Sequence, residues 1–325
     1  MIIVKPDFYD SFTCLADRCP DSCCQEWEVD VDAATAGRYL SLPSPLGDDL
    51  RRHLYPDEEN YRMRIENRRC PMWRQDGLCR IQAELGHDAL CKTCREFPRI
   101  SHDYDEFIEL GLEMSCPEAA QLLFTDYRFV ERDEQVEDPD LVLLLQTRKA
   151  ALDFLESRQM PIHEALAVLL LYAFQVQGAL DGDEMPVLSP ADDLLEARKY
   201  AGSGCIDGFY DFFLGLEILT PRWKALLESR PAHRKLDARL FYLAKYLINR
   251  HWLQAYADFD LVCRVKFILI ACLLVNALGD DPVQTAQLFS KEIENDDDNL
   301  NAILDSVYTC HAFTDSNLLG LLFKE

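Results

Sequence analysis

The sequence predicts an α+β protein in two parts, predominantly α overall: a small cysteine-rich α+β module over residues 1–130 and a mostly α-helical bundle over residues 135–325. Two observations predict this division. Most of the cysteines fall in the first part, together with short alternating stretches and turn residues. The second part has leucines at helical spacing and repeated helix starts in which a capping residue precedes a proline. We therefore expect a loop-rich module joined to an all-α domain.

The cysteines of the first part occur in short, unusual sequence motifs. The first four read C-x4-C-x3-C-C, and the later ones read C-P-M-W-x5-C, L-C-x-x-C-R-x-F-P-R and S-C-P-E. The candidate metal ligands are Cys14, Cys19, Cys23, Cys24, Cys70, Cys79, Cys91, Cys94 and Cys116. Either disulfides or a metal must account for so many thiols in one stretch.

The first residues bear on that choice. The stretch Met1–Asp7 has no basic region and no apolar core of signal length, so we find no export signal and expect a cytoplasmic protein. In a reducing compartment thiols stay free unless a metal binds them. The adjacent pair Cys23 and Cys24 and the close pair Cys91 and Cys94 favour metal, because thiolates must converge on one centre. We therefore prefer a metal to disulfides.

The spacing does not choose between metals. Thiolates select zinc, Cu(I) or iron–sulfur clusters. Only Cys91 and Cys94 have the C-x2-C spacing of a zinc ribbon, and the ferredoxin spacing C-x2-C-x2-C is absent. Cys19 and Cys23 begin a radical-SAM pattern, but Glu26 stands at its third position. The sequence therefore leaves two questions open. The metal is either zinc or an iron–sulfur cluster, and the thiols form either one site with spare thiols or two sites.

These cysteine motifs resemble those of the flagellin lysine-N-methylase (FliB) family. The matching pieces are Cys14–Cys24 with Trp27, Cys70-Pro71 through Cys79, Glu84-Leu85-Gly86 through Arg99, and Ser115-Cys116-Pro117-Glu118. The second half of the chain resembles the family only in its helical character.

The resemblance implies a reaction and a cofactor. That family is associated with transfer of methyl groups from S-adenosylmethionine to lysine side chains of flagellin, and with an iron–sulfur cluster, which we expect to be [4Fe–4S]. A wider set of cysteine-rich proteins with a C-C pair and a C-R-x-F-P word is similar and is described as zinc- or iron-chelating. Zinc is therefore the alternative metal, and flagellin is the expected protein partner.

The overall charge excludes some classes of partner. The formal charge of -24 argues against non-specific binding to nucleic acid or to an anionic membrane, since either needs a basic face. It is compatible with a partner that presents lysine. No run of eighteen apolar residues is present, and the most apolar piece, Phe267–Leu278, follows Arg264 and Lys266. We therefore expect neither nucleic acid nor membrane as a partner.

The elements of the first part follow from local patterns. Alternation over 27–31 predicts a strand, and Asp32 is the expected N-cap of a helix through Leu40. Residues 41–60 contain several prolines and are expected to be mostly loop, and 61–65 alternate again. A turn at Gln75-Asp76-Gly77 lets Cys70 and Cys79 face each other. We further expect a short helix over 81–90, two short strands within 100–112, and a helix from Cys116-Pro117 through Leu123.

The second part is expected to be helical to its end. Helix starts are predicted at Asp138-Pro139, Ser189-Pro190, Thr220-Pro221 and Asp281-Pro282. The acidic run over 292–298 is expected to be a solvated loop. The remaining cysteines are expected to be small buried apolar groups: Cys205, Cys263, Cys272 and Cys310.

Catalytic and cofactor-binding residues are not identified by any motif. No G-x-G-x-x-G loop follows a strand, so a pocket for S-adenosylmethionine would be unconventional, between the module and the bundle. Methyl transfer to nitrogen needs a neutral amine, and hence desolvation or a base. Polar candidates near the thiols are Glu26, Asp30, Asp32, Glu84, His87, Glu96 and Tyr104. His87 and His102 are further candidate metal ligands, and Arg95 and Arg99 are candidates to bind cluster sulfur or a carboxylate.

Three functions compete. The first is a lysine N-methyltransferase that acts on flagellin. The second is a non-catalytic metal-binding scaffold, with zinc or an iron–sulfur cluster, whose helical half binds a partner. The third is an electron-transfer protein. Binding of S-adenosylmethionine, partner binding without it, and a reversible one-electron couple would distinguish them.

Overall fold

A computed structural model describes residues 2–130, 136–202 and 204–324 of the chain. Its larger sheet has the strand order β5-β6-β1-β7. The strands are β1 Ile2–Pro6, β5 Arg99–Asp103, β6 Phe107–Leu112 and β7 Phe129–Val130. Strand β1 lies between two partners that come about a hundred residues later, parallel to β6 and antiparallel to β7. The first residues of the chain are thus an inner strand of a sheet completed near residue 130.

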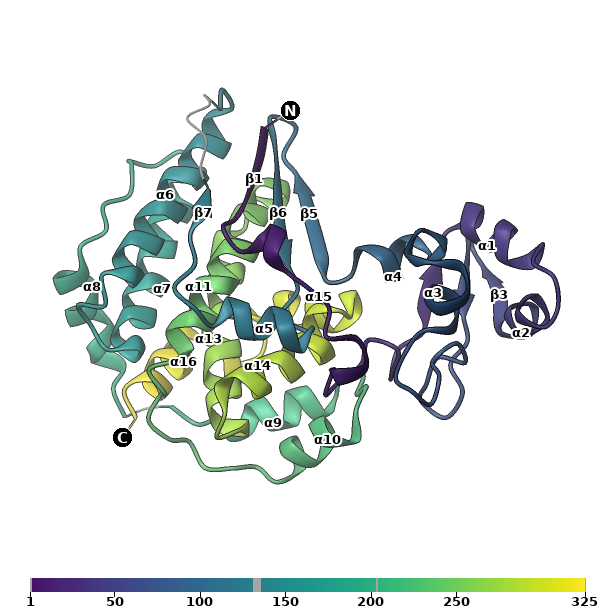
Figure 1. Cartoon of the computed structure of the whole chain (residues 1–325). Coiled ribbons are helices and arrows are strands. Elements are labelled where there is room, and N and C mark those ends of the chain that lie inside the picture. Colours follow the sequence, from purple (N-terminus) through teal and green to yellow (C-terminus); the bar gives the residue numbers. More distant parts are fainter. Residues whose placement is uncertain (1, 131–135, 203, 325) are drawn as a thin grey trace.

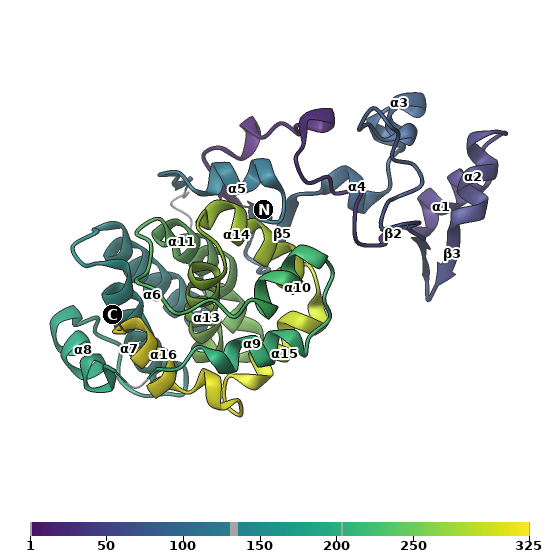
Figure 2. The same ribbon diagram turned by 90° about the horizontal axis from the view of Figure 1, so that it is seen from below.

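Between β1 and β5 the chain forms a separate lobe, which we call the thiol lobe (residues 19–97). It contains the sheet β2-β4-β3 and four short helices. Their bounds are β2 Val29–Val31, β3 Leu54–Asp57, β4 Asn60–Met63, α1 Ala33–Leu40, α2 Leu46–His53, α3 Arg80–Leu85 and α4 Lys92–Glu96. In Figure 1 this lobe projects to the right of the main body, and the view from below in Figure 2 shows the same separation.

The thiol lobe has a small hydrophobic core of its own. Val31, Ala36, Leu50 and Met63 are buried there, and Cys91 joins them. Strand β4 pairs with both β2 and β3, so the three strands form one face that α1 and α2 cover. The lobe therefore has local packing, although much of its length is irregular.

The rest of the chain is helical. After α5 Pro117–Leu123, the helices are α6 Pro139–Glu156, α7 Ile162–Leu180, α8 Pro190–Ala197, α9 Asp207–Leu214, α10 Pro221–Glu228, α11 Leu240–His251, α12 Ala255–Asp258, α13 Leu261–Leu278, α14 Pro282–Phe289, a π-helix Ser290–Glu294, α15 Asp297–Ser306 and α16 Asp315–Leu322. Short 3-10 turns lie at Tyr9–Ser11, Ala16–Arg18, His87–Ala89, Arg198–Tyr200, Trp252–Gln254 and His311–Phe313.

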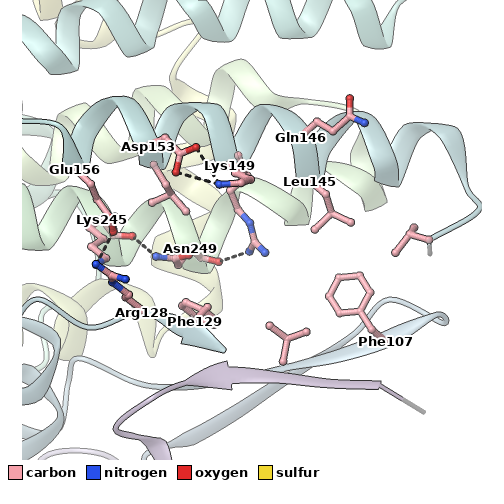
Figure 3. A pocket seen from close by; sticks show the side chains of 14 residues that line it. Phe107, Arg128, Phe129, Leu145, Gln146, Lys149, Asp153, Glu156, Lys245 and Asn249 are labelled. Atoms are coloured by element: carbon pink, nitrogen blue, oxygen red, sulfur yellow. Dashed lines mark hydrogen bonds and ion pairs between the residues drawn. The ribbon is translucent and has the colours of Figure 1, made fainter. Parts of the chain in front are cut away.

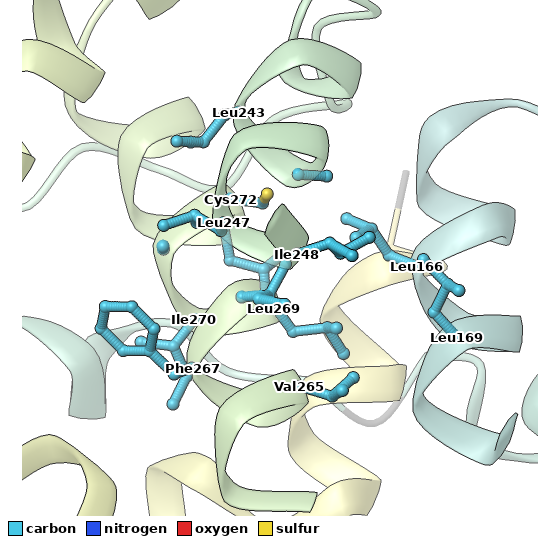
Figure 4. Close-up of a cluster of buried hydrophobic side chains, with 14 of the residues drawn as sticks. Leu166, Leu169, Leu243, Leu247, Ile248, Val265, Phe267, Leu269, Ile270 and Cys272 are labelled. Carbon is cyan, nitrogen blue, oxygen red and sulfur yellow. The ribbon is translucent and has the colours of Figure 1, made fainter. Parts of the chain in front are cut away.

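Helix α13 is the centre of the main core. All of its residues are buried, and α7 and α11 pack along it. Figure 4 shows Leu247 of α11 and Leu166 of α7 on either side of Leu269. A helix that is apolar on every face is stable only where neighbours surround it, because each exposed leucine would lose about 1.5–3 kcal/mol of burial free energy.

The larger sheet packs on this helical core. Phe107 of β6 and Met114 just after it belong to the same buried cluster as the leucines of α11 and α13. So does Tyr127, next to β7. The buried residues of the first 130 positions are therefore divided between two cores, one inside the thiol lobe and one shared with the helices.

Several predicted elements are confirmed. The protein is mostly helical, with small sheets. Asp32 caps α1, its carboxylate accepting a hydrogen bond from the Thr35 N–H at 2.9 Å. The strand pair over 100–112 and the helix after Cys116 are present. The four predicted cap-then-proline helix starts begin α6, α8, α10 and α14.

Two expectations for the thiol lobe were wrong in detail. Residues 41–60 are not mostly loop, because Leu46 and Leu50 bury one face of α2 and the chain continues into β3. The expected single helix over 81–90 is divided, since Gly86 adopts a positive φ of 88° that ends α3.

The expectation of a solvated loop over 292–298 was also wrong. Glu292 and Glu294 are buried in the π-helix, and α15 begins at Asp297. The Glu292 carboxylate accepts hydrogen bonds from the backbone N–H groups of Leu219 and Thr220, both at 2.8 Å. The buried acid of Glu292 thus satisfies backbone groups that lie far away in sequence.

The remaining cysteines and the apolar helices complete the comparison. Cys263 and Cys272 are buried as expected, whereas Cys205 is exposed and Cys310 is partly buried. Two helices, α7 and α13, are long and apolar enough by length and composition to cross a membrane. The α13 window is 100% buried and the α7 window 56% buried, and a core helix of a soluble protein passes the same test.

Candidate site at the thiol lobe

The nine candidate ligands are free thiols that lie in and beside the thiol lobe. Two close pairs stand out. A hydrogen bond from Cys23 lowers the pKa of Cys24 to about 7. In the same way a hydrogen bond with Cys94 lowers the pKa of Cys91, while the pKa of Cys94 is raised. A lowered pKa favours the thiolate, the form that binds metals.

One group of thiols lies within the lobe. Burial raises the pKa of Cys70 to about 12, and the charges of Cys24, Cys79 and Cys91 add to that effect. Burial also raises the pKa of Cys79, again with contributions from Cys24 and Cys91. Since thiols influence each other's pKa only when they are close, the folded lobe brings together thiols from separate motifs of the sequence.

A second group lies where the lobe meets the main body. Burial raises the pKa of Cys116, at the start of α5, to about 11, and Cys19 and Cys14 add to it. The pKa of Cys23 is raised by its hydrogen bond with Cys24 first, and by the charges of Cys14 and Cys116 among others. Cys23 and Cys24 therefore stand between the two groups.

The donor chemistry suits a thiophilic metal, but the side chains are not arranged around one centre. Within residues 2–130, 136–202 and 204–324, no three His, Cys, Asp or Glu side chains are positioned to hold a metal ion. Zinc or an iron–sulfur cluster needs three or four donors at about 2.0–2.3 Å from the metal or its irons. The thiols are thus gathered in one region without converging on a single point.

The loop that carries Cys19, Cys23 and Cys24 is attached to the helical half through Asp21. Its carboxylate lies 2.8 Å from Lys291 Nζ and accepts a hydrogen bond from Gln287 Nε2 at 2.9 Å. Gln287 also donates to the Ser115 carbonyl at 2.7 Å. These contacts tie the thiol loop, the residue before Cys116 and helix α14 together.

A cavity lies at this junction, which we call the junction cavity. Its volume is about 580 Å³. It is lined from the thiol lobe by Cys23, Trp27, Glu28, Val29, Asp30, Lys92, Thr93, Cys94, Glu96 and Phe97, and from the rest of the chain by Arg99, Glu113, Arg250, Glu294, Asn295 and Asp297. A cavity between two packed parts of a chain, with a thiol from each close pair in its wall, is where a small molecule would meet the candidate ligands.

The inner part of the junction cavity contains buried charges. Arg250, at the end of α11, has its Nε 3.0 Å from Glu294 Oε1, and His251 Nε2 lies 2.9 Å from the same oxygen. Burial lowers the pKa of His251. Burial raises the pKa of Glu113, which follows β6 and accepts a hydrogen bond from the Ser115 hydroxyl at 3.5 Å. Arg250 Nη1 has no hydrogen-bond partner among the described residues.

The outer part combines rings and carboxylates. Trp27 and Phe97 form an edge-to-face pair with their centroids 6.0 Å apart. Lys291 Nζ lies 4.9 Å from the centroid of the Trp27 ring, so this ring already accepts one cation. Of the nine charged residues that line the cavity, six are acidic (Glu28, Asp30, Glu96, Glu113, Glu294, Asp297) and three basic (Lys92, Arg99, Arg250).

The polar residues proposed from sequence have varied surroundings. Asp30, Glu96 and Arg99 line the junction cavity. Asp32 caps α1 and also accepts from the Lys92 N–H. Glu26 pairs with Arg68, Glu84 pairs with Arg80, and Arg95 lies near Glu96, whereas His87 is exposed. His102 and Tyr104 lie in or beside the larger sheet. His102 Nε2 and the Tyr104 hydroxyl have no hydrogen-bond partner among the described residues.

Sequence reasoning missed Arg250, Glu294 and Glu113. Arg250 lies in the last turn of α11 and resembles any charged residue near a helix end, and Glu294 lies in the run that was expected to be solvated. One available signal was the apolar spacing of Phe289 and Ile293, which makes the run amphipathic. No local pattern identifies Glu113.

A second cavity, of about 680 Å³, lies between the larger sheet and helices α6 and α11. Figure 3 shows Lys149 paired with Asp153 on α6, above Phe107 and Phe129 of the sheet. Two of its other cations pair with carboxylates, Arg148 with Glu109 at 2.7 Å and Lys245 with Glu156 at 2.7 Å, and Arg128 also lines it. The wall of this cavity contains no thiol.

Comparisons with known proteins support the family resemblance in part. Proteins named lysine-N-methylase from Salmonella typhimurium and Salmonella choleraesuis are each 30% identical over 131 residues, which cover 38% of this chain and 33% of the relative. A flagellar biosynthetic protein FliU from Salmonella muenchen is 29% identical over 133 residues, 38% of this chain and 78% of the relative.

The likeness is partial. The match spans about a third of the length of the lysine-N-methylases. No protein-family model matches the chain, and no solved structure matches it. These relatives support a FliB-like family and suggest a methyltransferase.

Proposed function

We propose that this protein is a protein lysine N-methyltransferase that takes its methyl group from S-adenosylmethionine. The observation that carries the proposal is the similarity to two proteins named lysine-N-methylase. The name of the third relative gives a flagellar context, so flagellin is the proposed substrate and the cytoplasm the proposed location. An iron–sulfur cluster held by some of the nine thiols, with zinc as the alternative, is part of the proposal.

The reaction is a displacement at carbon. The lysine nitrogen attacks the methyl carbon, the bond from that carbon to the sulfonium sulfur breaks, and S-adenosylhomocysteine leaves as a neutral thioether. The attacking nitrogen needs a free electron pair, so the lysine must lose a proton before or during the transfer. That proton passes to a base or to water.

The junction cavity offers suitable groups. Glu113 lines it, and burial raises the pKa of its carboxyl, which makes the carboxylate a better proton acceptor than an exposed glutamate. We propose Glu113 as the group that receives the lysine proton. The acidic surplus of the cavity would attract an ammonium group, and partial exclusion of water would favour its neutral form.

The thiols have a supporting part in this proposal. Bound by them, an iron–sulfur cluster supplies cross-links between loops and a redox-active centre, whereas zinc supplies the cross-links alone. Cys23 and Cys94 line the junction cavity, so metal binding there would fix one of its walls.

The test is methylation of flagellin. The full chain, purified without oxygen, is incubated with S-adenosylmethionine and with flagellin from a strain that lacks lysine methylation. Mass spectrometry should then show lysine residues heavier by one methyl group or more. Glu113→Gln should lower the rate by about a hundredfold if Glu113 is the base, whereas Asp153→Asn, in the second cavity, should not.

Unmodified flagellin would contradict the proposal. If flagellin gains no methyl group while the protein retains its metal, the methyltransferase assignment is wrong. A metal-binding scaffold without catalysis then becomes the better description.

A further inference from the structure

We propose that the junction cavity is the binding site for S-adenosylmethionine, with Arg250 binding its carboxylate and the acidic side chains facing its cationic centres. The inference rests on the proposed function and adds the place and the chemistry of recognition. No glycine-rich loop of the usual kind is present in the sequence, so the site must be built from other groups.

The cavity has the size and position that such a ligand needs. Its volume of about 580 Å³ lies within the range of roughly 300–1,000 Å³ typical of small-molecule sites. It is lined from both parts of the chain, by Trp27 and Cys94 on one side and by Glu113 and Arg250 on the other. A ligand here would be enclosed by groups from elements far apart in the sequence.

Arg250 provides the anchor for the carboxylate. Its Nε lies 3.0 Å from Glu294 Oε1, so the charge has one carboxylate partner. Neither Nε nor Nη1 makes a hydrogen bond among the described residues, and Arg250 lines the cavity. An unsatisfied buried donor is unfavourable, and a carboxylate is the acceptor that a guanidinium binds best.

The acidic side chains provide the complementary field for positive charge. S-adenosylmethionine has a sulfonium and an ammonium group, and six of the nine charged residues that line the cavity are acidic. Three of the six have cationic partners, Asp30 in Arg62, Glu96 in Arg95 and Glu294 in Arg250. Glu28, Glu113 and Asp297 have no ion-pair partner among the described residues and are the carboxylates open to a cationic ligand. Glu113 lines the cavity, and its carboxylate accepts a hydrogen bond from the neutral Ser115 hydroxyl. Asp297 begins α15 at the same wall. Arg250 beside these carboxylates matches a ligand with one carboxylate and two cations.

The aromatic pair provides a surface for the adenine ring. Trp27 and Phe97 stand 6.0 Å apart in edge-to-face contact and both line the cavity. Because Lys291 Nζ lies 4.9 Å from the centroid of the Trp27 ring, a flat ligand ring would stack on the face away from Lys291. Stacking of a heterocycle on such a ring stabilises binding beyond the area buried.

The second cavity lacks this combination. Arg148, Lys149 and Lys245 each have a carboxylate partner there, and Arg128 is the fourth cation in its wall. It has no tryptophan and no thiol in its wall. It therefore serves as the internal control for the experiment.

The experiment uses ligands that differ by one charge. Equilibrium dialysis measures binding of S-adenosylmethionine, of its decarboxylated form, and of S-adenosylhomocysteine, which lacks the sulfonium charge. The protein is the full chain purified without oxygen, either wild type or with Arg250→Lys, Glu113→Gln, Trp27→Leu or Asp153→Asn. Circular dichroism and metal content confirm that each variant is folded.

The expected pattern is specific to each charge. Arg250→Lys keeps the charge beside Glu294 but loses the planar fork, so affinity for S-adenosylmethionine should fall about tenfold or more, and affinity for the decarboxylated form should hardly change. Glu113→Gln should weaken binding of S-adenosylmethionine more than that of S-adenosylhomocysteine. Trp27→Leu should weaken binding of all three, and Asp153→Asn of none.

Three results would overturn the inference: no binding of S-adenosylmethionine to the wild type, equal affinity in the wild type and in all three cavity variants, or equal loss of all ligands in Arg250→Lys. The flagellin assay separates this failure from failure of the proposed function. Methylation of flagellin together with unchanged binding of S-adenosylmethionine in the variants would keep the methyltransferase assignment and reject the proposed binding site. Charge-specific binding without methylation would keep the site and reject the substrate.

Discussion

Lys291 and Asp21 form an ion pair across the boundary between the helical half and the thiol loop, with Nζ and Oδ1 2.8 Å apart. The two partners are unequally exposed: the Lys291 side chain is 2% exposed and that of Asp21 31%. A buried ammonium without a carboxylate is unfavourable, so this pair fixes where the thiol loop can lie.

Removal of the Asp21 charge should therefore loosen the boundary. We expect Asp21→Asn to lower the free energy of unfolding by about 1–3 kcal/mol, measured in urea, because the Lys291 ammonium stays buried. The double variant Asp21→Asn with Lys291→Met should recover part of the loss. Equal stability of Asp21→Asn and the wild type would show that the pair does not hold the boundary.

The thiols should control metal content. Serine at Cys23, Cys24, Cys91 or Cys94 should lower bound iron or zinc and also solubility, because metal binding free energy acts as folding free energy, roughly 10–16 kcal/mol for structural zinc in small peptides. Alanine at Cys272, which is buried in α13, should leave metal content unchanged. Metal analysis of protein purified without oxygen makes the measurement. Unchanged metal in all four serine variants would reject the assignment.

His102 should make stability depend on pH. Burial lowers its pKa from 6.5 to about 4, so the ring is neutral in the fold and takes up a proton on unfolding below pH 6.5. Stability from this group is therefore complete above pH 6.5 and is lost as the pH falls toward 4, by about 1.4 kcal/mol per pH unit at most.

The matching variant is His102→Gln. Between pH 7 and pH 4.5 the wild type should lose up to about 2–3 kcal/mol more than the variant, measured by urea unfolding at each pH. Parallel curves for the two proteins would show that His102 does not take up the proton.

The pair Glu109–Arg148 joins the larger sheet to α6. The guanidinium donates to both carboxylate oxygens, at 2.9 and 2.7 Å, and both side chains are nearly buried. We expect Glu109→Gln to lower the free energy of unfolding by about 3–5 kcal/mol, because it leaves Arg148 buried without its carboxylate. Lys149→Met, which removes an exposed pair on the same helix, should change stability by less than about 1 kcal/mol.

Local rules predicted much of the fold. Asp32, Asp138 and Asp281 each cap a helix as their sequences indicate, because capping depends on neighbouring residues alone. Alternation found β2 and β4 for the same reason. The prolines before Leu46 gave a misleading signal, since a proline is tolerated at a helix start as well as in a loop.

The candidate site was predictable only on its thiol side. The cysteine motifs are local and unusual, so all nine thiols could be selected from the sequence as candidate ligands. The opposite wall depends on the meeting of Glu113, Arg250 and Glu294, which no pattern in a single sequence connects. Glu294 is buried and Arg250 nearly so, whereas sequence statistics place such charges on the surface, and only tertiary contacts reverse that expectation.

The position of β1 between β6 and β7 makes the thiol lobe an insertion. A protease that cut the β3–β4 turn, at Glu58–Glu59, would produce two fragments that stay associated, because the parallel pairing of β1 with β6 and the Asp21–Lys291 contact both join one fragment to the other. Conversely, loss of the first six residues would open two strand edges in the main body while leaving every cysteine in place. The integrity of the thiol lobe and the closure of the sheet are thus separable by where the chain is broken.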